Sequence, residues 1–455
     1  MKEPVGSRLV TASAADEPVA RMSKVPKPAQ PGSSGRHGLK RRLEHAGPVA
    51  LAGGFSLITN VLVTLAVARV LTPRGYGSFI QLLGIFVVLS MPGSAIQVGV
   101  VRRVTAWDGA GTSGMVLPWV RLWHRRAGLI VVLAGLASAA VSPWVARLLS
   151  LPSWSCVIAV GCAGAAWVPL SIDRGLLQAR RAYAPLAGNM ILESITKALW
   201  VVALAAAGTG ASGAIFGLLA AELIATLHAF GASRRTISTL PTGYSANKRA
   251  SLRRNLVSDV AAALCTLGLL AWLQNFDVII LGREAPGASG QYAAISVAAK
   301  SIAYGAIALS FYLLPEAAIR RQLGGLGFKP LWIAGALLAV PAASELLVAV
   351  IMPHWAISAV FGARLAGASG SFATLVGAMI LLSGTVMLSY YLLGAGHRGI
   401  VAILALGAVG ATAAALVSHG RVGMTAGTDL GLQAALLLVV GIYFGAVHHE
   451  KRVLQ

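Results

Sequence analysis

The feature that most constrains the fold is a series of apolar runs, each about 20 residues or longer, separated by short polar stretches. At a rise of about 1.5 Å per residue, a helix of this length crosses the ~30 Å hydrocarbon core of a bilayer. Apolar residues make up 56% of the chain and charged residues only 11%, whereas about 25% of residues are charged in soluble domains. The sequence therefore predicts an all-α, polytopic membrane protein.

Twelve such spans are predicted. They cover residues 47–71, 76–100, 127–149, 154–177, 184–206, 209–231, 256–281, 291–317, 331–352, 371–393, 398–418 and 428–447. The longest polar break between spans divides them into six and six. Because each half has an even number of spans, both halves start from the same side of the membrane and can be parallel repeats around a central cavity.

The predicted domain organisation follows from this count. It consists of a disordered basic cytoplasmic tail at 1–45, a six-helix lobe at 46–231, a basic cytoplasmic linker at 232–255, a second six-helix lobe at 256–447 and a cytoplasmic tail at 448–455. The first tail is rich in Pro, Ser, Ala, Gly and basic residues and has no apolar periodicity, which is typical of disordered segments. It lacks the apolar core and cleavage site of a secretory signal, so we expect no cleavage.

The formal net charge of +22 could suggest nucleic acid as a partner, but the basic residues lie in short clusters between apolar runs. In this arrangement they follow the positive-inside rule, so nucleic-acid binding is not expected. Of the 37 Lys and Arg residues, 28 fall on one side of the predicted spans. The other side holds six, namely Arg69, Arg74, Arg147, Arg283, Arg364 and Arg421. This bias predicts that both termini are cytoplasmic.

Several stretches carry a family resemblance. They are R-V-L-T-P-R-G-Y-G at 69–77, N-F-D-V-I-I-L-G at 275–282, G-Q-Y-A-A at 290–294, Y-L-L-P-E at 312–316 and L-G-A-G-H-R-G at 393–399. In sequence and in placement they resemble the Wzx-type polysaccharide flippases of the multidrug/oligosaccharidyl-lipid/polysaccharide exporter superfamily. The resemblance covers the layout of residues 47–447, although the specific stretches make up a small part of that range.

This resemblance implies two six-helix lobes around a central cavity that opens alternately to each side of the membrane. It also implies a function, the movement of polyprenyl-diphosphate-linked saccharide from the inner to the outer leaflet of a bacterial plasma membrane for cell-surface polysaccharide synthesis. The partners would be the lipid-linked saccharide, membrane lipids and the glycosyltransferases or polymerase of the same pathway.

Basic residues inside or close to the spans are the candidate substrate-binding groups. An ionised side chain inside a span costs about 2.5 to 3.5 kcal/mol to insert, so it normally faces a protein interior or a wet cavity. Lys197 and Lys300 lie near mid-depth, and Arg174 and Arg69 lie nearer the span ends. Together they could attract an anionic diphosphate. The alternatives are that the lysines pair with nearby acids and that the arginines reach toward lipid headgroups.

Four acids within the spans are candidates for ion coupling or for local pairing. Glu193 lies four residues before Lys197 on the same helical face, so these two side chains can neutralise each other. Asp277 lies in the N-F-D-V stretch, and Glu222 and Glu345 lie inside the sixth and ninth spans. Each could respond to protons or sodium, or could serve only as a structural partner.

Missing motifs argue against an enzyme. The sequence has neither the G-x-x-x-x-G-K-[ST] phosphate loop nor the G-x-S-x-G nucleophile turn, and it has no His-rich metal spacing. Its three cysteines all lie inside apolar runs. We therefore expect no catalytic residue, metal or cofactor. Two other functions stay open: a cation-coupled multidrug extruder of the same superfamily, and a non-transporting membrane scaffold for glycosyltransferases.

Overall fold

The computed structural model describes residues 35–109, 112–237, 249–322 and 328–453. The chain divides into two units, Met1–Gly47 and Pro48–Gln455. Of the first unit only the start of helix α1 is described, so most of the predicted tail at 1–45 lies outside the described residues. So do the central part of the predicted linker, 238–248, and the last two residues of the C-terminal tail. The following paragraphs concern the second unit.

The described ranges contain helices and no strand, which confirms the all-α prediction. The first lobe consists of α1 (Gly35–Val70), α2 (Pro73–Gly109), α3 (Val116–Leu148), α4 (Ser155–Ala179), α5 (Tyr183–Leu204) and α6 (Gly210–Ile237). The second lobe consists of α7 (Arg249–Glu284), α8 (Ser289–Gln322), α9 (Lys329–Ile351), α10 (Pro353–Phe361), α11 (Phe372–Gly394), α12 (Ile400–Val417) and α13 (Val422–Val453).

Eleven segments among the described residues are long and apolar enough to cross a membrane. One of them, Tyr183–Ile237, has 55 residues and holds two helices, α5 and α6, which pack against each other. The chain reverses between them at a π-helical turn, where Gly208 and Gly210 have φ of 83° and 65°. Only glycine adopts such positive φ values without strain. Counted as two crossings, this hairpin gives the twelve that the sequence predicts.

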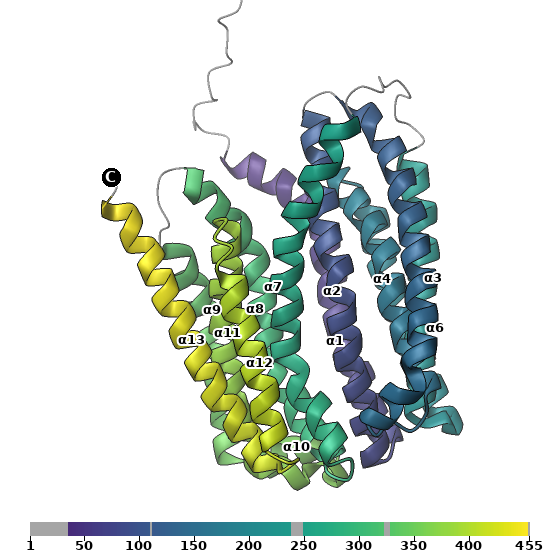
Figure 1. Ribbon diagram of the computed structural model, residues 1–455, viewed down its shortest axis with the longest axis vertical. Helices are drawn as coiled ribbons and strands as arrows, with labels where there is room; N and C mark the ends of the chain where they lie inside the picture. The colour runs from purple at the N-terminus through teal and green to yellow at the C-terminus, as the bar shows by residue number, and fades with distance from the viewer. Residues whose placement is uncertain (1–34, 110–111, 238–248, 323–327, 454–455) are drawn as a thin grey trace, which may run out of the picture. The chain divides into compact units, whose positions relative to one another are not determined.

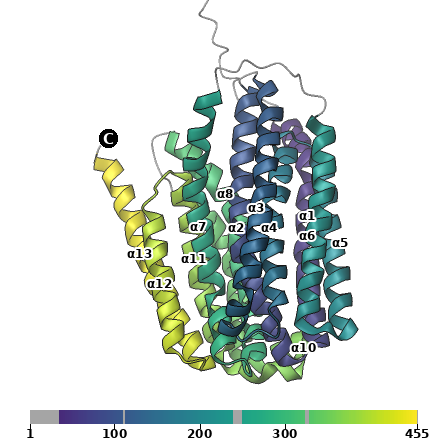
Figure 2. The same cartoon turned by 45° about the vertical axis from the view of Figure 1, so that its right-hand side comes forward.

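The connection after α9 differs from the expected short loop. It contains α10 and a 3₁₀ helix, η4 (Ala363–Ser371), and the sharp bend between them occurs at Gly362, whose φ is 98°. In Figures 1 and 2, α10 lies at the end of the bundle opposite the C-terminus. We call this the outer end, as the charge distribution predicts, and the opposite end the inner end.

The two lobes repeat one packing scheme. In the first lobe α4 is central and packs on α2, α3 and α6, while α5 packs on α6. In the second lobe α11 is central and packs on α8, α9 and α13, while α12 packs on α13. Helices in corresponding positions therefore make corresponding contacts, as parallel repeats require.

The lobes meet mainly along α2, which packs on both α7 and α8. Figure 1 shows α7 beside α2, between the remaining helices of the two lobes. Small residues allow this close approach: a Cβ atom on Gly84 would lie 3.2 Å from the Asn275 Cβ, and one on Gly282 would lie 2.7 Å from the Gln81 Cδ. Gln81 in turn donates a hydrogen bond to the Ile279 carbonyl across the interface, at 2.9 Å.

Helices α3 and α9 occupy corresponding places and are the least enclosed. Only 11% and 17% of their most apolar windows are buried in the protein, against 72% for α4. Between their ends, most of their exposed side chains are apolar, for example Leu136 and Val340. In a membrane protein such surfaces face the lipid.

Candidate functional site

A cavity of about 370 Å³ lies between the lobes, within the ~300–1,000 Å³ range of small-molecule sites. Its walls come from α2 on one side and from α7, α8, α11 and the turn after α11 on the other. The lining residues are Val87, Met91, Ser94, Ala95, Val98, Gly99, Arg102, Ala262, Ala263, Leu267, Leu270, Ala271, Gln274, Tyr304, Ile307, Val386, Tyr390, Leu393, Gly396 and Arg398. The lining is therefore mostly apolar.

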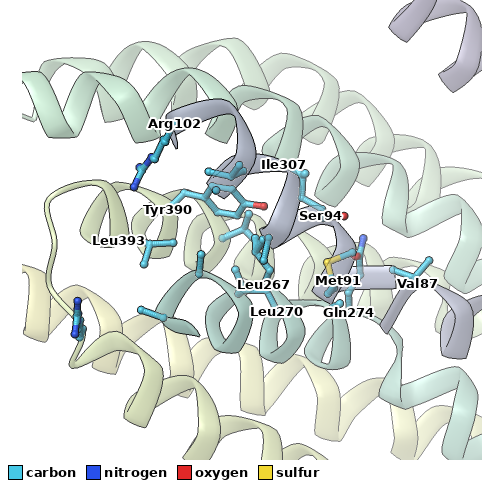
Figure 3. A pocket seen from close by; sticks show the side chains of 18 of the residues that line it. Val87, Met91, Ser94, Arg102, Leu267, Leu270, Gln274, Ile307, Tyr390 and Leu393 are labelled. Carbon is cyan, nitrogen blue, oxygen red and sulfur yellow. The ribbon is translucent and has the colours of Figure 1, made fainter. Parts of the chain in front are cut away.

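The charge of this lining has one sign. Its basic side chains are Arg102 and Arg398, and among the described residues no Asp or Glu lines the cavity. Figure 3 shows Arg102 near Tyr390 and Leu393 at one end of the cavity. Because α2 runs from the outer to the inner end, Arg102 lies ~22 Å along the helix beyond Val87, toward the inner end. The geometry suits a ligand with an anionic group and an apolar part.

The deep end of the cavity carries polar groups. Gln274 lines it and is buried, and its Nε2 amide nitrogen has no hydrogen-bond partner among the described residues. A buried donor left without an acceptor is costly, which favours a bound acceptor such as a phosphate or sugar oxygen. Ser94, also on the lining, accepts a hydrogen bond of 3.2 Å from the Trp167 Nε1.

Directly behind this deep end lies a buried charged cluster of the second lobe. Lys300 Nζ on α8 lies 3.3 Å from Asp277 Oδ1 on α7 and donates to Asn275 Oδ1 at 3.4 Å. Asp277 Oδ2 accepts hydrogen bonds from the Tyr292 hydroxyl at 3.1 Å and the Ser296 hydroxyl at 3.0 Å. The predicted Lys300 and Asp277 therefore meet as a pair.

Sequence reasoning missed two members of this cluster on α13. Asp429 is buried within electrostatic range of Asp277 and Lys300, and Gln433 donates to Asp429 Oδ1 at 3.0 Å. Asp429 Oδ2 and Gln433 Oε1 have no hydrogen-bond partner among the described residues. The spacing of an acid and an amide at i and i+4 was the available signal, but Asp429 stood at the edge of the predicted span.

The first lobe holds a second buried charged cluster. Arg174 on α4 and Lys197 on α5 both bind Glu193, at 2.6 Å to Oε2 and 2.7 Å to Oε1. Arg174 Nε also donates to Asn189 Oδ1 at 2.7 Å. The expected Glu193–Lys197 pair forms, and Arg174 joins it from the neighbouring helix.

Glu222 on α6 completes this cluster. Lys197 Nζ lies 3.4 Å from Glu222 Oε1, yet neither carboxylate oxygen of the buried Glu222 accepts a hydrogen bond from a described residue. Nearer the inner end, Asp173 accepts a hydrogen bond of 2.6 Å from Ser233 and contacts His124 Nε2 at 2.9 Å. The first lobe thus contains a polar core of its own.

The two remaining predicted residues lie elsewhere. Arg69 is at the outer end, where it donates to the carbonyls of Ala359 and Val360 at 3.1 and 3.5 Å. Glu345 on α9 accepts a short hydrogen bond from the Ser301 hydroxyl on α8. None of the predicted residues Arg69, Arg174, Glu193, Lys197, Glu222, Asp277, Lys300 and Glu345 lines the 370 Å³ cavity. Their roles in binding or coupling stay predictions.

No protein-family model and no curated protein matches the sequence, but solved structures match the fold. An inward-facing conformation of a multidrug resistance MATE family transporter of the MOP superfamily aligns with a TM-score of 0.61 and 14% identity, over 86% of this chain and 95% of that chain. An outward-facing conformation of a MATE family transporter aligns with a TM-score of 0.56 and 14% identity, over 90% and 97%.

A third structure is a MOP superfamily transporter from Pyrococcus furiosus, with a TM-score of 0.58 and 14% identity over 88% of this chain and 96% of that chain. It is described as having a binding pocket of reverse polarity, which suggests a different function for that protein. The present chain therefore has the two-lobed fold of the MATE-like transporters of the MOP superfamily.

Proposed function

We propose that this protein transports an anionic amphiphile across the plasma membrane of a bacterium, and that the amphiphile is a polyprenyl-diphosphate-linked saccharide destined for the cell surface. The observation that carries the proposal is the lining of the interlobe cavity, which is mostly apolar, contains Arg102 and Arg398, and has no acid among its described residues. Such a lining attracts a diphosphate and offers nothing to neutralise a cation.

The size of the cavity supports a model in which only the headgroup of the substrate enters the protein. A volume of about 370 Å³ holds a headgroup of a few sugar or phosphate units but not a long polyprenyl chain. The chain would therefore stay in the bilayer while the headgroup enters between the lobes. The unpaired Gln274 amide at the deep end would then bind an oxygen of the headgroup.

The fold supports a transport cycle with alternating access. Neighbours of this fold occur in inward-facing and outward-facing conformations, and here the cavity lies toward the inner end. The headgroup would enter from the cytoplasm, where both termini are predicted to lie, and would leave after the outer end opens. The buried acids behind the cavity, Asp277 and Asp429, are the groups through which an ion gradient could drive the cycle.

A second candidate function is a cation-coupled multidrug extruder, because several structural neighbours are described as MATE multidrug transporters. A cationic drug would need acids in the cavity wall. The polarity of the lining therefore separates the two candidates.

The deciding experiment compares substrates in proteoliposomes. We expect the protein to move an undecaprenyl-diphosphate-linked saccharide between leaflets, measured by its access to a membrane-impermeant glycosidase. The double substitution Arg102→Gln with Arg398→Gln should lower the rate roughly 10-fold or more, since it removes both charge-assisted contacts. The matched control is Arg125→Gln, an exposed inner-end arginine outside the cavity lining, which should leave the rate unchanged.

Two other results would contradict the proposal. Uptake of a cationic dye that is insensitive to the Arg102→Gln and Arg398→Gln substitutions, together with no movement of the lipid-linked saccharide, would replace the proposal with the extruder. If neither substrate moves while the protein is folded and correctly inserted, the scaffold function gains support.

A further inference from the structure

We infer that Arg69 and Arg364 form the latch of an outer gate, which joins the two lobes in this conformation and has to release before the outer end can open. Arg69 belongs to the first lobe and Arg364 to the second, and each donates hydrogen bonds to a helix end of the opposite lobe. The inference depends on the transporter fold and is independent of the proposed substrate.

The first half of the latch caps α10. Arg69 donates through one terminal nitrogen to the carbonyls of Ala359 and Val360, which lie in the last turn of α10. Carbonyls in a last turn lack helical partners and carry the negative end of the helix dipole. The Arg69 guanidinium supplies these carbonyls with a hydrogen-bond donor and places a positive charge at the negative end of the dipole.

The second half of the latch caps α1. Arg364 donates to the Arg69 carbonyl at 2.9 Å. In a continuous helix that carbonyl would bond the amide four residues later, but this residue is Pro73, which has no N–H. The sequence around the α1–α2 turn thus leaves an acceptor that Arg364 fills from the other lobe.

Close packing surrounds the latch. The Tyr76 ring lies 6.3 Å from the Phe361 ring across the interface, and Tyr76 is fully buried. At the start of α8, a Cβ atom on Gly290 would lie 1.9 Å from the Pro73 carbonyl oxygen. Only glycine permits this approach of the two backbones, so the outer ends meet without a gap at this point.

The type of contact suits a gate. Within the described ranges neither latch arginine forms an ion pair, so each holds the opposite lobe through charge and helix dipole. Both sites are partly exposed to solvent, which lets water take over the hydrogen bonds when they break. Such contacts hold a conformation without making it permanent.

The test measures the separation of the outer ends directly. Spin labels on Trp154→Cys in the first lobe and Trp355→Cys in the second, both exposed, report the distance by double electron–electron resonance in a cysteine-free background reconstituted in lipid. We expect Arg69→Gln with Arg364→Gln to raise the ratio of open to closed outer ends roughly 10-fold, because two charge-assisted contacts are lost. The control Arg74→Gln, an exposed arginine of the same turn, should not change the ratio.

A second variant probes the gate without touching a charge. Gly290→Ala should lengthen the outer distance because the new methyl group meets the Pro73 carbonyl, whereas Gly287→Ala, whose Cβ meets nothing within 4 Å, should not. Identical distance distributions for wild type, the double arginine variant and Gly290→Ala, with unchanged melting temperatures, would overturn the inference. Because the readout is a distance, it stands or falls separately from saccharide transport.

Discussion

Each lobe buries a lysine in a cluster of charged side chains, and the two clusters differ in composition. In the first lobe Lys197 shares its cluster with a second cation, Arg174, and the two face two acids, Glu193 and Glu222. In the second lobe Lys300 is the one cation among the described residues of a cluster that contains two acids, Asp277 and Asp429. Equal numbers of charges in the first cluster allow complete pairing, whereas the second has an acid in excess.

Because of this difference, the first cluster should tolerate the loss of one cation, whereas the second depends on Lys300. If one cation is removed from the first cluster, the other still holds Glu193. If Lys300 is removed from the second, two buried acids remain without a cation. An excess buried acid is costly in a low-dielectric interior unless a proton or a metal cation accompanies it. The second cluster is thus the better candidate for ion coupling, and the first the better candidate for a structural core.

The largest expected effect comes from Lys300→Met. It should lower the free energy of unfolding by about 3–5 kcal/mol, because it leaves Asp277 and Asp429 without their cation. Unfolding by SDS in mixed micelles measures the change. The added substitution Asp277→Asn should restore much of the loss, and a double variant as unstable as Lys300→Met alone would contradict the pairing.

Lys197→Met should cost less, about 1–3 kcal/mol, because Arg174 continues to bind Glu193. The same SDS titration checks this value. Should Lys197→Met prove more damaging than Lys300→Met, the contrast between a redundant and a dependent cluster would be wrong.

Glu222→Gln tests the first cluster from its acidic side. The Glu222 oxygens accept no hydrogen bond from a described residue, and Glu193 still pairs with both Arg174 and Lys197 when Glu222 is neutral. Loss of the 3.4 Å contact with Lys197 should therefore change the free energy of unfolding by only about 1 kcal/mol. Asp277→Asn is the matched comparison, since Asp277 accepts three bonds and should lose more stability. Equal losses would show that the hydrogen-bond count does not govern these acids.

Glu345→Gln should have the smallest effect, within about 0.5 kcal/mol. Glu345 is only partly buried on the lipid-facing helix α9 and bonds a single serine hydroxyl, to which an amide oxygen can also bond. A large loss of stability or of transport in proteoliposomes would contradict this expectation and would favour a role of Glu345 in ion coupling, which is one of the two roles that the sequence predicts for it.

Periodicity and length were sufficient to predict the long helices, because each span must satisfy its own backbone in lipid. They were insufficient for α10, because a nine-residue helix that begins at Pro353 is too short to span a membrane. Within one helix, the Glu193–Lys197 pair could be read from its spacing.

Contacts between helices could not be read in this way. The bonds from Arg174 to Glu193 and from Lys300 to Asp277 depend on how helices rotate and approach each other, which a single sequence does not specify. A central cavity was predicted, but the residues that line it were missed for the same reason. Arg102 and Arg398 lie near predicted span ends, where basic residues usually record topology, and only the position of α2 against the second lobe brings them to the same cavity.

The exposed flanks formed by α3 and α9 have a consequence for handling the protein. These helices depend on surrounding hydrocarbon for most of their contacts, so the bilayer acts as part of their packing. A short-chain detergent that thins this layer should loosen both flanks before it disturbs the enclosed α4 and α11. Amide hydrogen exchange in micelles should then be fast in α3 and α9, one helix in each lobe. The same measurement in lipid nanodiscs should show both helices protected.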